Sequence, residues 1–257
     1  LSLFLILSLG ISHGALDHIK GKKLLKIFNY RSTTIFYVLY TFVGLSIIFL
    51  WLLFPKILLL AFLIVASFHF GKEDSEFIHY KPNQDLIYFF KGSLVITAPL
   101  LFHKIETLEI FNNLNFDISQ NIFISDEILI LFISASFIAN IFISLKQQLD
   151  IKSLLIMDFI SILILNYFLS PILAFTIYFC FLHSIRHSLK LSNELNKNNF
   201  IKGIKEFLIK VIPLTISTAI IFLISLFFLK NYYFLDNAIS KVIFIGLASL
   251  TFPHILL

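Results

Sequence analysis

The sequence predicts an all-α, polytopic integral membrane protein: a helical bundle of about nine transmembrane helices, with eight as the alternative count. Two observations predict this class. Of the 257 residues, 58% are hydrophobic and only 14% are charged, whereas a soluble domain has roughly 25% charged residues. The hydrophobic residues also form runs long enough to cross the ~30 Å hydrocarbon core of a bilayer. We expect one transmembrane domain over residues 1–257.

Nine apolar runs are the candidate spans, in chain order. Pro55 and Pro171 each begin a new run after a tight turn. Because the sequence begins with Leu1 and stops at Leu257 inside an apolar run, we expect it to be truncated at both ends. The runs cover approximately residues 1–18, 33–54, 56–71, 86–103, 127–145, 152–169, 171–189, 207–229 and 237–257.

Basic residues gather on one side of the predicted bundle. Residues 19–31 alone hold four lysines and Arg31, and alternate counting of the nine runs places most of the 20 lysines and arginines on that same side. The positive-inside rule makes this side cytoplasmic, so we expect a multi-pass protein of the cell (inner) membrane. Topology and attraction to anionic lipid account for the net charge of +5, and no nucleic-acid partner is needed. One cysteine, Cys180, excludes an internal disulfide and a multi-cysteine metal site.

Two histidines near the end of the seventh run are the first candidate functional residues. His183 and His187 are four residues apart, so in a helix their imidazoles lie on one face, about one turn from each other. Ionisable side chains inside membrane spans are rare and usually face the bundle interior. The pair therefore indicates a site for a metal ion or a ligand.

Three more histidines are predicted at a similar depth. His13, His69 and His254 lie near the cytoplasmic ends of the first, third and ninth runs, and the pair lies near that end of the seventh. Isolated histidines at span ends usually contact headgroups or water. That reading explains poorly why four separate runs bring imidazole to one layer, which favours a shared metal site in the cytoplasmic half of the bilayer. Neutral imidazoles suit Zn, Cu, Fe or Ni, and the spacing does not rank these metals.

Asp17 is the acidic residue nearest to this layer, one turn after His13. It could bind the metal directly, but we prefer a supporting role in which its carboxylate accepts the proton of a ring nitrogen and so fixes the orientation of that ring. His18, some 140° round the helix from His13, should face a different neighbour. Pro253 should kink the last run just before His254.

Four motifs, in this order and spacing, resemble the Brp/Blh-type β-carotene 15,15′-dioxygenases, which are bacterial and archaeal membrane proteins associated with retinal supply for rhodopsins. The resemblance covers essentially the whole chain. The motifs are Gly10-Ile-Ser-His13-Gly-Ala-Leu-Asp17-His18, Ser67-Phe-His69-Phe-Gly-Lys, His183-x-x-x-His187 and Pro253-His254.

The resemblance implies a non-haem Fe(II) enzyme that cleaves the central double bond of β-carotene with O₂ to give two molecules of retinal. By matching position, it implies His13, His69, His183 and His187 as iron ligands and gives His254 and Asp17 supporting roles. No external reductant is then needed, and the sequence shows no glycine-rich nucleotide loop. We expect β-carotene to enter from the bilayer, and a functional link to a microbial rhodopsin; the oligomeric state stays open.

Three alternatives remain. A membrane di-iron desaturase or hydroxylase also uses histidine motifs on helices, but it needs about twice as many histidines and an electron donor. A transition-metal transporter needs ligands on both sides of the midplane and usually acidic residues within the spans, where this chain has little beyond Asp17 and Asp158. The third alternative is a carotenoid-binding protein without catalytic activity.

Overall fold

The computed structural model describes residues 1–30, 33–78, 85–116 and 125–257, except for the side chains of Ile11, His13, Ala15 and Thr33. Within these ranges the secondary structure is helical, with no strand, which confirms the all-α class. Two helices, η1 and η4, are π-helices and η2 is a 3₁₀-helix. The helices are α1 Ser2–Leu5, η1 Ile6–Gly10, η2 Ile11–Leu16, α2 Asp17–Ile27, α3 Thr33–Leu53, α4 Pro55–Glu73, α5 Asp85–Phe102, α6 Lys104–Asn113, α7 Asp126–Ser144, α8 Leu149–Phe168, α9 Pro171–Ile177, η4 Tyr178–Ser184, α10 Ile185–Leu195, α11 Phe200–Leu229 and α12 Leu235–Ile255.

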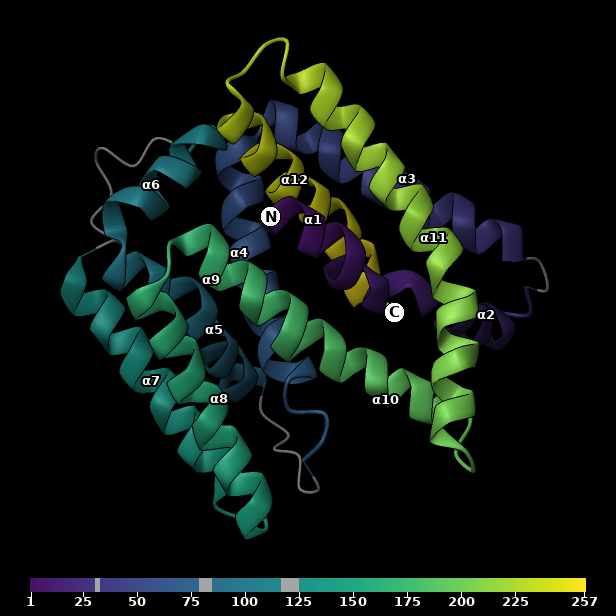
Figure 1. Ribbon diagram of the computed structural model, residues 1–257, viewed down its shortest axis with the longest axis horizontal. Helices are drawn as coiled ribbons and strands as arrows, with labels where there is room; N and C mark the ends of the chain where they lie inside the picture. The colour runs from purple at the N-terminus through teal and green to yellow at the C-terminus, as the bar shows by residue number, and fades with distance from the viewer. Residues whose placement is uncertain (31–32, 79–84, 117–124) are drawn as a thin grey trace. The chain divides into compact units, whose positions relative to one another are not determined.

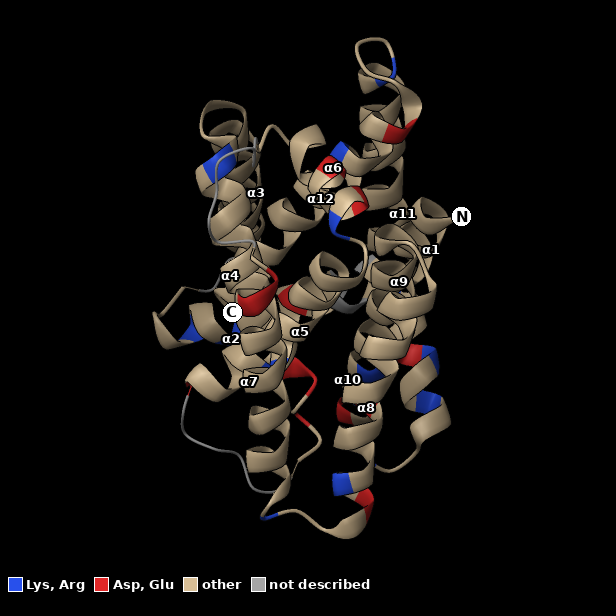
Figure 2. Ribbon diagram, turned by 90° about the vertical axis from the view of Figure 1, so that its left-hand side faces the viewer, with Lys and Arg blue, Asp and Glu red and all other residues tan. Residues whose placement is uncertain are grey.

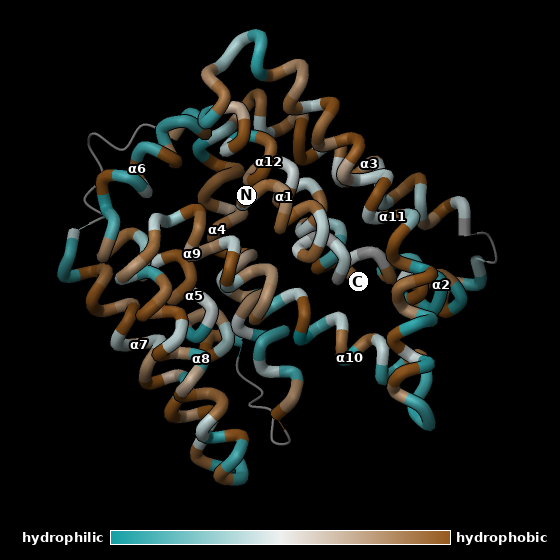
Figure 3. The backbone as a smooth tube through the Cα atoms, in the orientation of Figure 1, coloured by the Kyte–Doolittle hydropathy of each residue, from teal (hydrophilic) through white to brown (hydrophobic). Residues whose placement is uncertain are grey.

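Eight helical stretches of the described chain are long and apolar enough to cross a membrane, so this is a polytopic membrane protein. They are α3, α4, α5, α7, α8, the continuous stretch from α9 to α10, α11 and α12. Each coincides with one of the predicted runs from 33–54 to 237–257, although α10 and α11 extend further toward the loop between them. Hydrophobic residues follow these helices and hydrophilic ones gather where the chain turns (Figure 3). Charged residues lie mostly at helix ends and connections (Figure 2).

The predicted span over residues 1–18 is not one of the eight helices. This segment is built from α1, η1, η2 and the start of α2, so it changes from α- to π- to 3₁₀-helix within 16 residues. Gly10 and Gly14, which have low helix propensity, lie in the irregular part. Irregular backbone at membrane depth is tolerated where protein or a cavity surrounds it, and here α10 and α11 pack against η2. The described structure therefore supports the alternative count of eight spans, and the prediction of one regular span over residues 1–18 was wrong.

The chain forms two compact units, of which unit 1 comprises Leu1–Leu58 and Phe179–Leu257. In this unit α3 packs against α2 and α12, and α11 packs against α10, α12, η1 and η2. Figure 1 shows α11 and α12 as the green and yellow helices of this unit. A cluster of buried apolar side chains ties η2, α10 and α11 together: Leu16, Leu191, Phe207 and Val211.

Unit 2 comprises Leu59–Tyr178 and is organised around α5, which packs against α6, α7 and α8. Helices α7 and α8 lie side by side in Figure 1. Two glycines let α4 and α5 approach at backbone distance. A Cβ atom at Gly71 would collide with the carbonyl oxygen of Tyr88, and one at Gly92 with that of Ser67. Small residues at such crossings are the usual means of close helix packing in membranes.

Unit 2 also encloses a buried polar network. The Lys91 ammonium donates hydrogen bonds to the carbonyl oxygen of Asp74, at 3.0 Å, and to Oγ of Ser75, at 2.9 Å. The Tyr178 hydroxyl donates to the Asp74 carboxylate at 2.6 Å. A charge inside a membrane protein is stabilised by such partners. Lys91 therefore serves to hold the C-terminal end of α4 against α5.

Candidate metal centre

The two histidines of the His-x-x-x-His pair lie where η4 passes into α10. Both are buried: His183 is 1% exposed and His187 is 5% exposed, and their Nε2 atoms are shielded from solvent. The Phe179 ring stacks on His183 with 5.7 Å between ring centres and 16° between the planes. Imidazoles held in this way belong to the protein interior, and not to the lipid-facing surface that isolated span-end histidines occupy.

A π-helix supplies the backbone for His183. Residues Tyr178–Ser184 form η4 before the chain returns to α-helix at Ile185. Single π-helical turns are rare and frequently mark functional sites. The Ser184 hydroxyl donates a buried hydrogen bond of 2.9 Å to the carbonyl oxygen of Gly10. This bond joins the histidine pair to the N-terminal segment that carries His13.

Asp17 and His254, at opposite ends of the chain, form a buried pair. Nδ1 of His254 lies 2.8 Å from each carboxylate oxygen of Asp17, and the residues are 7% and 4% exposed. A carboxylate only accepts hydrogen bonds, so Nδ1 carries the proton, and in a neutral ring the lone pair then lies on Nε2. Carboxylates orient metal-binding imidazoles by this same contact.

Tyr40 holds Asp17 from the other side. Its hydroxyl, on α3, donates a hydrogen bond of 2.8 Å to Oδ2 of Asp17 and lies 3.4 Å from the carbonyl oxygen of Leu250. The sequence analysis missed Tyr40. A signal did exist, because a tyrosine inside an apolar span needs a partner for its hydroxyl when it is buried.

The Asp17–His254 pair adjoins the His183–His187 pair within unit 1. The rings of His187 and His254 are 6.2 Å apart between centres and nearly perpendicular, at 83°. With metal–nitrogen bonds of about 2.1 Å, this separation is near the upper limit for two imidazoles on one ion. Gly14 lies beside them: a Cβ atom there would be 3.7 Å from the Asp17 carboxylate and 3.9 Å from Nδ1 of His254.

The remaining predicted residues have different outcomes. His13 belongs to η2 in unit 1, but its side chain lies outside the described residues. His69 lies on α4 in unit 2 and is 6% exposed. Its convergence with the histidines of unit 1 stays a prediction. His18 faces Tyr37, with the rings stacked 6.3 Å apart. Helix α12 continues through Pro253 to Ile255.

The donor set suits a transition metal. Buried imidazole nitrogens bind Fe, Zn, Cu or Ni, whereas Mg and Ca prefer oxygen. Cys180, adjacent to this site in sequence, is a buried free thiol. The described side chains therefore fit the iron that the resemblance implies, with the Asp17 carboxylate engaged by Tyr40 and His254.

Comparison with known proteins gives one consistent result. Residues 4–257 match the family described as beta-carotene 15,15′-dioxygenase. A curated relative of that name, from an uncultured marine bacterium 66A03, is 26% identical over 261 residues, which cover 100% of this chain and 91% of the relative. No solved structure gives a significant match.

Proposed function

The chain belongs to the β-carotene 15,15′-dioxygenase family, and we propose that it cleaves the central 15,15′ double bond of β-carotene with O₂ to give two molecules of retinal. The family match over residues 4–257 carries this proposal, because it includes all of the motif histidines. A multi-pass helical protein also suits a substrate that is dissolved in the bilayer and enters sideways between helices.

The proposed reaction is balanced without a reductant. One carbon–carbon double bond breaks, and each of its two carbons ends as an aldehyde with one oxygen atom. Both atoms of O₂ are consumed, so the four electrons that reduce O₂ come from the two oxidised carbons. The proposal therefore requires no nicotinamide or flavin cofactor.

We propose Fe(II) as the cofactor, held by His13, His69, His183 and His187. The buried Nε2 atoms of His183 and His187 support this assignment. When bound, the ion would supply the redox chemistry by which O₂ reacts with the polyene. The protein's own contribution is to hold the imidazoles in place and to keep bulk water out. Phe179 against His183 serves both purposes.

Asp17 and His254 are proposed as supporting residues, with Tyr40 added from the structure. The Asp17 carboxylate fixes which nitrogen of His254 carries the proton, and the Tyr40 hydroxyl fixes the carboxylate. Hydrogen bonds of this kind set the direction of a ring and the position of its lone pair. The three side chains come from α2, α3 and α12, so they also brace these helices at the site.

We further propose the cell membrane as the location, with the site in the cytoplasmic half of the bilayer. The distribution of basic residues supports this orientation. Retinal released there into lipid would be available to a microbial rhodopsin in the same membrane.

The test is retinal formation by membranes that contain the protein, supplied with β-carotene, Fe(II) and air. We expect two retinals for each β-carotene consumed, and no dependence on an added reductant. Apocarotenals from off-centre cleavage would contradict the proposed cleavage at the 15,15′ bond. Two irons per chain with a demand for reductant would favour a di-iron desaturase, and metal uptake into vesicles without retinal would favour a transporter.

A further inference from the structure

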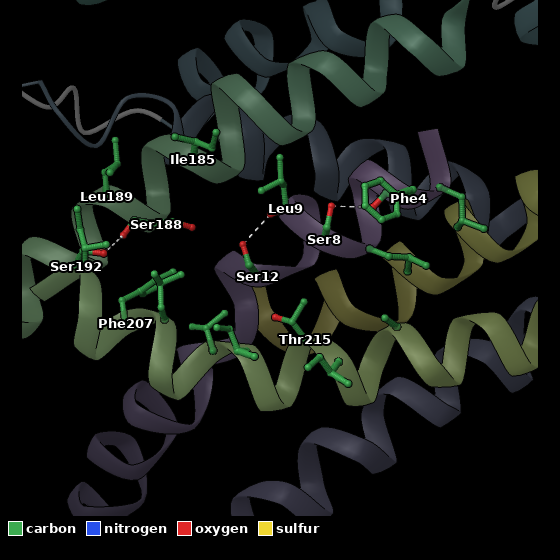
Figure 4. A pocket seen from close by; sticks show the side chains of 18 of the residues that line it. Phe4, Ser8, Leu9, Ser12, Ile185, Ser188, Leu189, Ser192, Phe207 and Thr215 are labelled. Atoms are coloured by element: carbon green, nitrogen blue, oxygen red, sulfur yellow. Dashed lines mark hydrogen bonds between the residues drawn. The ribbon is translucent and has the colours of Figure 1, made fainter. Parts of the chain in front are cut away.

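Unit 1 contains a cavity of about 840 Å³ beside the candidate metal centre. Its walls are formed mainly by α1, η1, η2, α10 and α11, and almost all of its lining is apolar (Figure 4). This volume is within the range of roughly 300–1,000 Å³ typical of small-molecule sites. Several lining residues, among them Phe4, Leu208 and Leu223, are exposed, so we expect the cavity to open toward the lipid.

The cavity and the histidine pair use different faces of the same helical stretch. Ile185, Ser188, Leu189 and Ser192 line the cavity at the i, i+3, i+4 and i+7 positions of one helix face. His187 lies one residue before Ser188 and so faces about 100° away. The histidine side and the cavity are therefore separated by the width of one helix.

Two hydroxyl groups in this apolar wall lack the partner that such groups normally find. In helices, serine and threonine usually donate to a backbone carbonyl three or four residues earlier. Ser192 does so at 2.8 Å from the carbonyl oxygen of Ser188, and Ser12 does so at 2.7 Å from that of Leu9. In contrast, Oγ of Ser188 and Oγ1 of Thr215 are buried without a hydrogen-bond partner in the described structure. Both side chains face the space between the helices in Figure 4.

An unpartnered hydroxyl in an apolar membrane interior is costly, which indicates a ligand with an oxygen acceptor. β-Carotene is a hydrocarbon and offers none. Retinal has the same polyene and ring but ends in an aldehyde oxygen. Of the two polyenes in the reaction, retinal therefore has an acceptor for these hydroxyl groups and β-carotene does not.

We propose that the cavity is a binding site for the retinal product, with its polyene against the apolar wall and its aldehyde oxygen accepting a hydrogen bond from Ser188 or Thr215. This inference rests on the proposed function for the identity of the ligand. The site holds one retinal beside the metal centre before the molecule passes into the bilayer.

The test measures retinal binding by the full-length protein in detergent after metal removal, so that no turnover occurs. Labelled all-trans-retinal is titrated in equilibrium dialysis, with β-carotene as the hydrocarbon comparison. We expect Ser188→Ala or Thr215→Val to weaken retinal binding by roughly 3- to 10-fold, the range for one lost hydrogen bond, without changing β-carotene binding. Ala219→Phe, which fills the cavity, should abolish retinal binding.

Thr218→Val is the matched control, because Thr218 lies on α11 outside the cavity lining and its hydroxyl already donates to the Leu214 carbonyl oxygen. This control should bind retinal like the wild type. Wild-type affinity in Ser188→Ala, Thr215→Val and Ala219→Phe alike would overturn the proposal. Binding is measured without catalysis, so a wild-type protein that binds retinal here but forms none from β-carotene would refute only the proposed function.

Discussion

Replacing Tyr40 by phenylalanine removes one hydroxyl and keeps the aromatic ring, including its contact with Phe36 at 5.4 Å between ring centres. The lost interaction is a 2.8 Å hydrogen bond to the buried Asp17 carboxylate. Hydrogen bonds to charged groups contribute about 1.5–3 kcal/mol, so we expect the free energy of unfolding to fall by that amount. Asp17 then loses one of its two fixed partners, and the His254 ring it orients gains rotational freedom.

The second expected effect of Tyr40→Phe is weaker iron binding, by about 10- to 100-fold, as for other residues that orient metal ligands. Reversible denaturant unfolding in detergent gives the stability, and competition with a chelator gives the iron affinity. Tyr37→Phe is the matched control. Tyr37 lies three residues earlier on the same helix and stacks on His18, so its change should stay within about 0.5 kcal/mol. If both variants lose equally little stability and iron affinity, Tyr40 does not position the site.

Three further outcomes follow from the same geometry. His183→Ala and His187→Ala should each abolish retinal formation and lower the bound iron per chain, while the protein stays folded in detergent. The control His103→Ala, just beyond the end of α5, should leave both retinal formation and iron content unchanged. Normal iron content in the first two variants would contradict the ligand assignment. Removal of metal by a chelator should stop the reaction, and Fe(II) should restore it, as measured by retinal yield. Gly92→Ala places a Cβ against the carbonyl oxygen of Ser67 and should destabilise the protein by roughly 1–3 kcal/mol, seen as a lower thermal midpoint; an unchanged midpoint would show that α4 and α5 separate without cost.

The transmembrane helices were predictable because the length and hydropathy of each apolar run indicate a span without reference to the rest of the chain. Length and hydropathy alone decide whether a segment crosses a bilayer, and eight runs followed that rule. The same rule failed for residues 1–18, because hydropathy reports where a segment prefers to be and not which helix type it adopts. The π- and 3₁₀-helical turns around Gly10 depend on contacts with η4 and α11, which are distant in sequence.

The candidate site was likewise predictable from the sequence only in part. The i, i+4 spacing of His183 and His187 is local, and the structure finds both buried on one helical stretch. The preferred supporting role for Asp17 was also read locally, from its position one turn after His13. Its described partners are instead His254, 237 residues away, and Tyr40 on α3. The helical periodicity of the sequence does not predict this pairing, because the pairing depends on how α2, α3 and α12 pack together.

The helical stretch from η4 to α10 shows why an irregular turn is useful at this point. An α-helix presents positions four residues apart on nearly one face, so a single straight helix offers one stripe to its neighbours. The π-helical turn at Tyr178–Ser184 adds a residue to the local turn, so it rotates the side chains that follow to new positions around the helix axis. After that shift, His187 faces His254, and Ser188 faces the cavity. One helix can therefore separate the proposed chemistry from the proposed product site, because the two sets of side chains alternate along it without sharing a face.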